Sequence, residues 1–419
     1  MTENLQNWDN YLSVASLSDV GMRRSNNQEN LAISMASNMD GWNRRGHLFI
    51  VADGMGAHAA GELASKLAVD HIPHLYGKYD ELPAFEALRK SVVDANTEIH
   101  KRGQANEEFH NMGTTCSTLL LMPSGAICAH VGDSRVYRLR KNRIEQLTFD
   151  HSLVWEMHKS GQLSEEEMEA GKIPKNVITR SLGPYPESKV DLEGPFPIMV
   201  NDKFLLCSDG LTGLVEDDEL GSLMANLPPD EAVRALVDLA NLRGGHDNIT
   251  CVIIHVKHPQ LATGADSTSG MAPRSKSSSL FNPISIAIVL VSAIIAAIFM
   301  FMGETATAII PGIVFAIGLI WLVVQLIQSA SSEGDVAGPR RLGEGPYVQK
   351  SCASGKNVAL QLKTMTTQLI NVAKQQNWKI DSEALDKMLQ SAEAAEGQES
   401  VKAYARCISF LMDQLRNQS

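Results

Sequence analysis

The stretch LFIVADGMGAHAAG, residues 48–61, decides the fold. Its apolar run Leu48–Val51 predicts a buried strand, and the Asp-Gly-Met-Gly that follows must turn sharply. Asp53 therefore comes at a strand end, where rigid backbone holds a carboxylate that water and cations can reach. Gly54 has no Cβ, so its backbone can approach a bound ion, and its carbonyl is a candidate ligand. Taken alone, the stretch is explained equally well by an ordinary Asp-Gly turn.

Further carboxylates recur at predicted strand ends. They are Asp209 in FLLCSDG (204–210), Asp247 in GGHDNITCVIIH (244–255) and Asp133 in AHVGDSRVYRL (129–139). Together with Asp53 they are too many for chance turns. Mg²⁺ and Mn²⁺ bind carboxylate, carbonyl and water oxygens, and two such ions can activate a water for attack on a phosphoryl group. The six cysteines show no C-x-x-C spacing, so we expect free thiols rather than a thiolate metal site.

A series of motifs follows in order between about residues 11 and 257. They read SDVGMRRSNNQEN, VADGMGAHAAGE, GTTCSTLLL, HVGDSRVYRLR, NVITRSLG, LLCSDGL and GGHDNITCVII. In this order they resemble the metal-dependent Ser/Thr protein phosphatase family (type 2C, bacterial branch). The resemblance implies an α+β fold over residues 1–258: a four-layer α/β/β/α sandwich with two Mn²⁺ or Mg²⁺ ions between its β-sheets.

The resemblance also implies how the metal ions are held. Asp53 would bridge both ions, and the Gly54 carbonyl would bind one of them. Asp209 and Asp247 would hold the other ion, and Asn248 would support Asp247. The reaction it implies is direct attack by a metal-activated hydroxide on phosphorus, without a covalent phosphoenzyme.

Two further residues acquire roles in the same way. Asp133 would bind a third ion together with Asp209; the alternative is a turn aspartate paired with the neighbouring Arg135. Arg24 stands where the family has an arginine that grips phosphate. A guanidinium suits this task because its planar fork of donors matches two phosphate oxygens at once.

Glu29 departs from the family pattern, which has Asp at this position. The additional methylene shifts the carboxylate, so Glu29 would hold a metal ion either directly or through a bound water. The departure also keeps a second function in view, a phosphatase-like binding module that has lost turnover. The number of converging carboxylates favours the enzyme.

Composition narrows the class of protein. The chain has 419 residues and a formal net charge of −11, which argues against a general nucleic-acid binder. Residues 1–10 are polar and carry Glu3 and Asp9, so no cleavable signal peptide is expected. Apolar residues at helical spacing predict helices over 59–74 and 81–102.

After His258 the composition changes. Residues 259–281 are rich in Ser, Gly, Ala and Pro and are expected to form a flexible linker. Within residues 282–328, two apolar runs, 283–302 and 305–327, are each long enough to cross a membrane as a helix. The alternative is a buried pair of soluble helices, but soluble core helices of this length rarely lack charges on every face.

The charges on either side of these runs predict their orientation. Arg274 and Lys276 precede the runs, and Arg340 and Arg341 follow them. Because basic residues mark the cytoplasmic side, we expect a hairpin in the plasma or inner membrane with both flanking domains in the cytoplasm.

Residues 342–419 are predicted to form a small helical cytoplasmic domain. Its expected helices, 357–376, 382–396 and 400–416, carry apolar residues at helical spacing. Docking of a protein partner, or self-association, is the role we expect of this segment. The whole chain is thus interpreted as a membrane-anchored phosphatase that acts on phosphorylated proteins and opposes Ser/Thr kinases.

Overall fold

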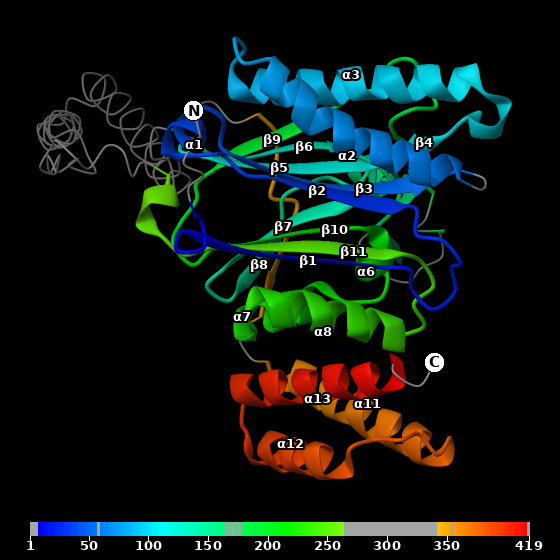
Figure 1. Ribbon diagram of the computed structural model, residues 1–419, viewed down its shortest axis with the longest axis vertical. Coiled ribbons are helices and arrows are strands. Elements are labelled where there is room, and N and C mark those ends of the chain that lie inside the picture. The colour runs from blue at the N-terminus through cyan, green and yellow to red at the C-terminus, as the bar shows by residue number, and fades with distance from the viewer. Residues whose placement is uncertain are drawn as a thin grey trace, which may run out of the picture. The chain divides into compact units, whose positions relative to one another are not determined.

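The apolar run Leu48–Val51 forms part of strand β3 (His47–Met55) in the computed structural model of the protein (Figure 1). Alternate residues of this strand face two different cores. Ile50 packs toward helices on one side, and Phe49 packs against a second sheet on the other. A strand covered on both faces is apolar throughout, which is why this stretch lacks polar alternation. The structure describes residues 7–56, 59–164, 167–168, 173–174, 177–263, 342–352 and 355–416.

Two antiparallel sheets pack face to face. Across sheet A the strands are β1 (Leu12–Asp19), β11 (Ile249–Val256), β10 (Lys203–Cys207), β7 (Arg135–Arg140), β8 (Arg143–Gln146) and β12 (Val348–Ser351). Across sheet B they are β2 (Glu29–Ser34), β3, β5 (Cys116–Met122), β6 (Gly125–Val131) and β9 (Asp191–Phe196), with β4 (Gly113–Thr114) paired to β3. Apolar side chains from both sheets, among them Phe49, Leu119, Phe204 and Val252, form the core between them.

Helices cover the outer faces of the two sheets (Figure 1). On sheet B lie α2 (Ala60–Lys78) and α3 (Ala84–Ala105), which confirm the helices predicted over 59–74 and 81–102. On sheet A lie α7 (Asp217–Asn226) and α8 (Pro229–Leu242). The predicted α/β/β/α sandwich is therefore confirmed. The shorter helices are α1 (Met39–Arg45), η1 (Glu107–Phe109), α4 (Leu153–Lys159), α6 (Asp209–Thr212) and η2 (Pro259–Leu261). All six cysteines are buried free thiols, as expected.

The chain after residue 342 joins the sandwich in one compact unit. Its helices are α11 (Lys356–Gln375), α12 (Ser382–Ala394) and α13 (Gln398–Arg416), close to the predicted ranges. Strand β12 extends sheet A by antiparallel pairing with β8. Cys352, just after β12, packs so closely on α7 that a Cβ on Gly221 would lie 2.2 Å from its sulfur.

Helix α13 packs against α7 and α8, and its apolar side chains belong to the same core as those of sheet A. Charged residues flank this contact. The Arg406 guanidinium donates to both carboxylate oxygens of Glu231, at 2.6 and 2.7 Å, and Arg416 lies 2.7 Å from the buried carboxylate of Asp238. The amphipathic pattern predicted the helices, and the structure shows that α7 and α8 of the sandwich cover part of their apolar faces.

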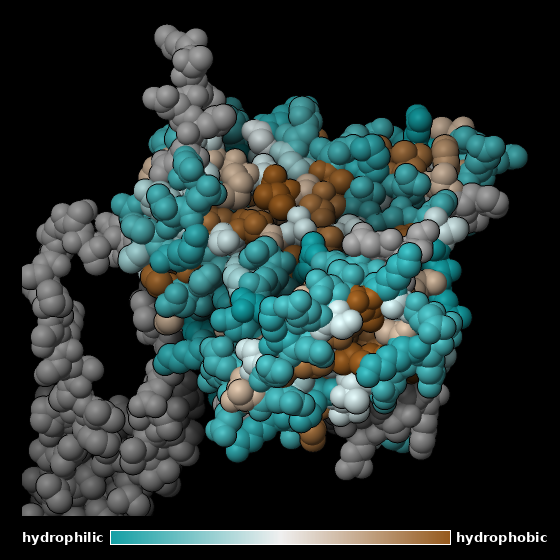
Figure 2. Space-filling model, turned by 60° about the horizontal axis from the view of Figure 1, so that its bottom comes forward, coloured by the Kyte–Doolittle hydropathy of each residue, from teal (hydrophilic) through white to brown (hydrophobic). Residues whose placement is uncertain are grey.

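The outer side of the helical segment is mostly polar. Figure 2, in which the bottom of Figure 1 comes forward, shows mainly hydrophilic residues with hydrophobic ones between them. Leu360 and Val372 of α11 are the large apolar side chains of the described tail that are exposed. A protein partner of residues 342–419 stays a prediction.

The predicted membrane hairpin, 283–302 and 305–327, lies outside the described residues, as does most of the linker 259–281. Within the part of the chain that the structure describes, no helix combines the length and apolar character needed to span a membrane.

Candidate metal centre

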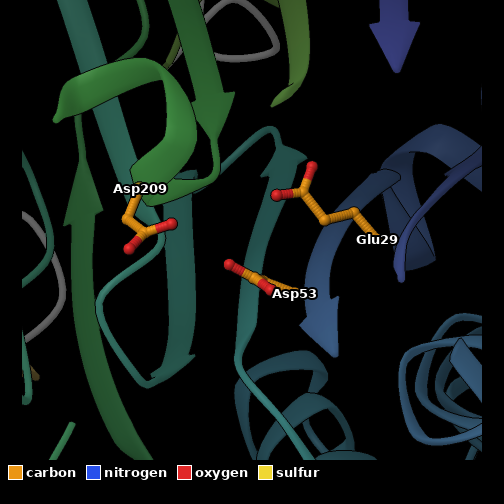
Figure 3. Close-up of side chains that lie close together, drawn as sticks. All are labelled: Glu29, Asp53 and Asp209. Carbon is orange, nitrogen blue, oxygen red and sulfur yellow. The ribbon is translucent and has the colours of Figure 1, made fainter. Parts of the chain in front are cut away.

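Three carboxylates meet where the two sheets face each other (Figure 3). Glu29 begins β2 and is directly paired with Asp53 of β3, whereas Asp209 follows β10 of the other sheet and begins α6. Each side chain offers one oxygen, and these oxygens all lie within 4.8 Å of one another. The site is therefore formed by residues from both sheets. Glu29, the residue that departs from the family pattern, belongs to this cluster.

Close backbone contacts hold the loops that carry these carboxylates. A Cβ on Gly210, next to Asp209, would lie 1.9 Å from the carbonyl oxygen of Asn248. A Cβ on Gly54 would lie 2.0 Å from the carbonyl oxygen of Gly61, at the start of α2. Any side chain at Gly54 or Gly210 would therefore push these segments apart. The Asp-Gly pairs fix the position of their carboxylates by allowing backbone to pack on backbone.

Hydroxyl groups beneath the centre position Asp53. The Asp53 N–H donates to Thr115 Oγ1 at 2.9 Å, and the Asp53 carbonyl accepts from the Thr115 N–H at 2.8 Å. Thr115 Oγ1 also lies 2.8 Å from the hydroxyl of Ser134, which follows Asp133. Sequence reasoning assigned Thr115 no role. The signal that could have marked it is the hydroxyl pair of Thr114 and Thr115 immediately before an apolar strand.

Arg24 and Asp247 lie at the open edge of the centre. Arg24 Nη2 is 2.7 Å from Asp247 Oδ2, and both side chains are substantially exposed. Asp247 is not within the 4.8 Å cluster, yet its charge acts on Glu29, Asp53 and Asp209. Arg24 is therefore placed to meet an anion that approaches the carboxylates from solvent.

Asn248 fixes the loop that carries Arg24. Its side-chain amide donates to the carbonyls of Val20 and Asn26, both at 2.9 Å, and its Oδ1 accepts from the N–H of Gln28. Asn248 also donates its backbone N–H to Asp247 Oδ1. The side chain thus organises residues 20–28, while the expected support of Asp247 comes from the backbone.

Asp133 is buried beside the cluster, and its Oδ1 has no hydrogen-bond partner among the described residues. The alternative expectation paired it with Arg135. In the structure, the Arg135 guanidinium instead binds Asp150, with Nη2 at 2.7 Å from Oδ2. Asp133 is thus left facing the charge of Asp209, which the third-metal prediction requires.

The electrostatics of the centre call for a cation. Burial, together with repulsion from Asp209 and Asp247, raises the pKa of Glu29 to about 8, although the neighbouring hydroxyls of Thr250 and Ser208 act in the opposite direction. Burial and repulsion from Asp209 and Asp150 raise the pKa of Asp133 to about 8. The pKa values of Asp53 and Asp209 are also raised, mainly by burial. Both carboxylate oxygens of Glu29, and Oδ1 of Asp209, lack partners among the described residues.

Buried polar atoms are normally hydrogen-bonded, so oxygens without partners that face one another indicate a ligand. Carboxylate and carbonyl donors suit hard divalent cations such as Mg²⁺ and Mn²⁺. The residues present therefore fit the predicted metal. Among the described residues, the cluster of candidate ligands contains no histidine. Nδ1 of His100 lies 2.8 Å from the Gly183 carbonyl.

The chain is similar in sequence to known proteins. A sequence profile described as protein phosphatase 2C matches residues 34–239. The chain is 38% identical over 248 residues to a 2C-type protein phosphatase from Streptococcus pyogenes. This match covers 58% of the present chain and 97% of the relative. The chain is 36% identical over 249 residues to protein phosphatase PhpP from Streptococcus pneumoniae, with the same coverage of both chains.

The fold is also similar to that of a solved structure. This is the serine/threonine phosphatase PstP/Ppp from Mycobacterium tuberculosis, which matches the present structure with a TM-score of 0.53 and 31% identity. The match covers 59% of this chain and all of the other.

Proposed function

Because the chain belongs to the protein phosphatase 2C family of metal-dependent Ser/Thr phosphatases, we propose that it hydrolyses phosphoserine and phosphothreonine in proteins at the Glu29–Asp53–Asp209 centre. The observation that carries this proposal is the convergence of buried carboxylate oxygens without partners from both sheets. Glu29 lies within the cluster, which speaks against the alternative of a binding module without turnover.

The residues present would divide the work as follows. Asp53, Asp209 and Glu29 would hold two Mn²⁺ or Mg²⁺ ions, with Asp247 and the Gly54 carbonyl at their edges and Asp133 available for a third. When bound, the ions would supply an activated water and offset phosphoryl charge. Arg24 would bind the phosphoryl oxygens with its guanidinium fork and so orient the phosphorus toward the carboxylate cluster. A thiol nucleophile is not available, since every cysteine is buried.

The test is hydrolysis of a phosphothreonine peptide by the full-length protein with Mn²⁺, with Mg²⁺ and with chelator. We expect metal-dependent turnover that falls by at least about 100-fold in Asp53→Asn and Asp209→Asn, since each removes a charged metal ligand. Asp70→Asn, on the exposed face of α2, is the matched control and should keep full activity. A folded protein that binds Mn²⁺ yet turns over no phosphopeptide would shift the assignment to the binding module.

Membrane anchoring is the second part of the proposal. It is supported by the apolar runs 283–302 and 305–327 and by the basic residues that flank them. With the phosphatase domain on the cytoplasmic side, its substrates would be phosphoproteins made by Ser/Thr kinases there. Cell fractionation tests this: the full chain should sediment with membranes and resist alkaline extraction, and a chain lacking 283–327 should not. Equal behaviour of the two chains would contradict anchoring.

A further inference from the structure

His151 is a buried histidine beside the metal centre to which sequence reasoning assigned no role. It follows the aspartate that binds Arg135, and its side chain is fully buried. Its backbone N–H donates to the Gly132 carbonyl at 2.8 Å, and its Nδ1 accepts from the Gly132 N–H at 3.0 Å. His151 therefore binds both polar backbone groups of the residue that precedes Asp133.

These contacts determine the tautomer of the ring. Because the Gly132 N–H points at Nδ1, a neutral imidazole must carry its proton on Nε2. Nε2 lies 3.0 Å from Asp191 Oδ2, which accepts that proton in a hydrogen bond. Arg180 Nη1 also lies 3.2 Å from Nε2 and donates to the same carboxylate oxygen, so Asp191 Oδ2 is the acceptor that the two N–H groups share. Asp191, on β9, thus fixes the ring in the orientation in which Nδ1 accepts the hydrogen bond from the Gly132 N–H.

Through Asp191 and Arg180, the His151 ring also connects the Gly132–Asp133 turn to helix α4. Arg180 lies 3.2 Å from Asp191 Oδ2 with one nitrogen and 3.2 Å from Glu156 Oε1 of α4 with another. The His151 carbonyl accepts from the N–H of Thr179, next to Arg180. Asp191, Arg180 and Glu156 therefore brace the imidazole from the side opposite Gly132.

Other side chains hold the far end of the turn, at Ser134: its hydroxyl lies 2.8 Å from Thr115 Oγ1, and its carbonyl accepts from the Ser117 hydroxyl at 2.7 Å. Gly132 has φ +113°, and a Cβ there would lie 2.6 Å from the Thr115 side chain. Residue 132 must therefore lack a side chain, and its backbone packs directly on Thr115. His151 supplies the side-chain bond to its backbone N–H. A shift of this turn moves Asp133, because the two residues share a peptide bond.

We propose that His151 is a positioning residue that holds the Gly132–Asp133 turn, and so the Asp133 carboxylate, in place for metal binding, with Asp191 fixing the ring. This inference rests on the proposed function, in which Asp133 is a metal ligand. It concerns how that ligand is held and leaves the chemistry of hydrolysis unchanged.

Two conservative variants separate the two bonds of the ring. In His151→Asn the side-chain oxygen takes the place of Nδ1 and can still accept from Gly132, while the bond to Asp191 is lost. In His151→Gln the side-chain nitrogen takes the place of Nε2 and can still donate to Asp191, while the bond to Gly132 is lost. His47→Asn is the matched control, since His47 is also buried and its Nδ1 also accepts a backbone N–H, that of Ala36.

The readout is calorimetric titration of the chelator-treated full-length protein with Mn²⁺, with Asp133→Asn identifying the site concerned. We expect His151→Gln to weaken Mn²⁺ binding at that site by about 10- to 100-fold, the usual effect of losing a partner that orients a ligand. His151→Asn and His47→Asn should stay within about threefold of wild type, although all three variants lose a contact and unfold at lower temperature.

Equal losses in the asparagine and glutamine variants, or wild-type binding in His151→Gln, would overturn the proposal. If His151→Gln does not fold, nitrogen NMR of the wild-type imidazole with Mg²⁺ decides. A proton on Nε2 supports the proposal, and a proton on Nδ1 refutes it. Absence of phosphopeptide turnover in a wild type that binds Mn²⁺ at the Asp133 site would refute the proposed reaction and leave this inference standing.

Discussion

Glu29→Gln should stabilise the metal-free protein while impairing the loaded one. Glu29 is 5% exposed, and its carboxylate oxygens have no partners among the described residues. Its pKa is about 8 in the folded, metal-free state, against 4.5 as its ordinary value. The folded state therefore binds a proton that the unfolded state releases. The stability that this proton supplies is complete below about pH 4.5 and is lost as the pH rises toward 8.

The magnitude follows from the difference between the two pKa values. At pH 7 the proton that Glu29 must take up on folding costs at most about 3 kcal/mol relative to pH 4.5, at roughly 1.4 kcal/mol for each pH step above 4.5. A glutamine is neutral at every pH, so it should recover about 1–3 kcal/mol at pH 7 and nothing near pH 4.5. With Mn²⁺ the order should reverse, because bound metal stabilises the wild type by mass action and the variant has lost a ligand.

The assay is urea unfolding of wild type and Glu29→Gln at pH 5, 6 and 7, each with chelator and with saturating Mn²⁺. Asp202→Asn is the matched control, because Asp202 is also buried but has a partner: Arg140 lies 2.7 Å away. It should lose about 3 kcal/mol at pH 7, since it leaves the partly buried Arg140 without its counter-charge. A Glu29→Gln protein that is no more stable than wild type in chelator at pH 7, or whose advantage does not shrink toward pH 5, would refute the reasoning.

Other changes probe the rest of the structure. Thr115→Val removes the acceptor for the Asp53 N–H and should cost about 1–3 kcal/mol in urea unfolding and lower kcat more than it changes KM; an unchanged kcat would show that this hydroxyl does not position Asp53. Gly221→Ala should cost about 1–3 kcal/mol through its clash with Cys352, and Cys352→Ala in the same chain should recover most of that loss. Independent effects of these two substitutions would contradict the close packing of the tail on α7. Arg24→Lys should raise KM for a phosphopeptide about tenfold with little change in Mn²⁺ affinity, because it keeps the charge but loses the planar fork; a fall in Mn²⁺ affinity instead would place Arg24 among the groups that hold the metal.

The sandwich could be predicted because seven motifs recur in the order of the family; the apolar strands and Asp-Gly turns alone indicated clustered carboxylates but not two facing sheets. The same motifs indicated Asp53, Asp209 and Asp133. The sequence could not show that Glu29 lies directly beside Asp53, because that pairing depends on the register of two strands. Nor could it distinguish Thr115 and His151 from packing residues. Their roles depend on which backbone groups face them.

The tail shows a different limit. Helical periodicity identifies the apolar face of α13 but does not say what covers it. Strand β12 has no strand signal at all, since Val348–Ser351 reads VQKS and most of it is exposed. It forms because the edge of β8 offers unpaired backbone groups to any segment that reaches it.

The attachment of this tail has a consequence for how the molecule can be divided. The compact unit comprises residues 1–266 and 340–419, and its description ends at residue 263 and resumes at residue 342. The part after residue 342 is held by a β-ladder, an apolar face and ion pairs, none of which needs the covalent connection. A protease that cuts between these residues would therefore leave two fragments that remain associated, and the protein could be produced as two separate chains that assemble into one phosphatase. Cleavage there would interrupt the chain without removing α11, α12 and α13 from the phosphatase.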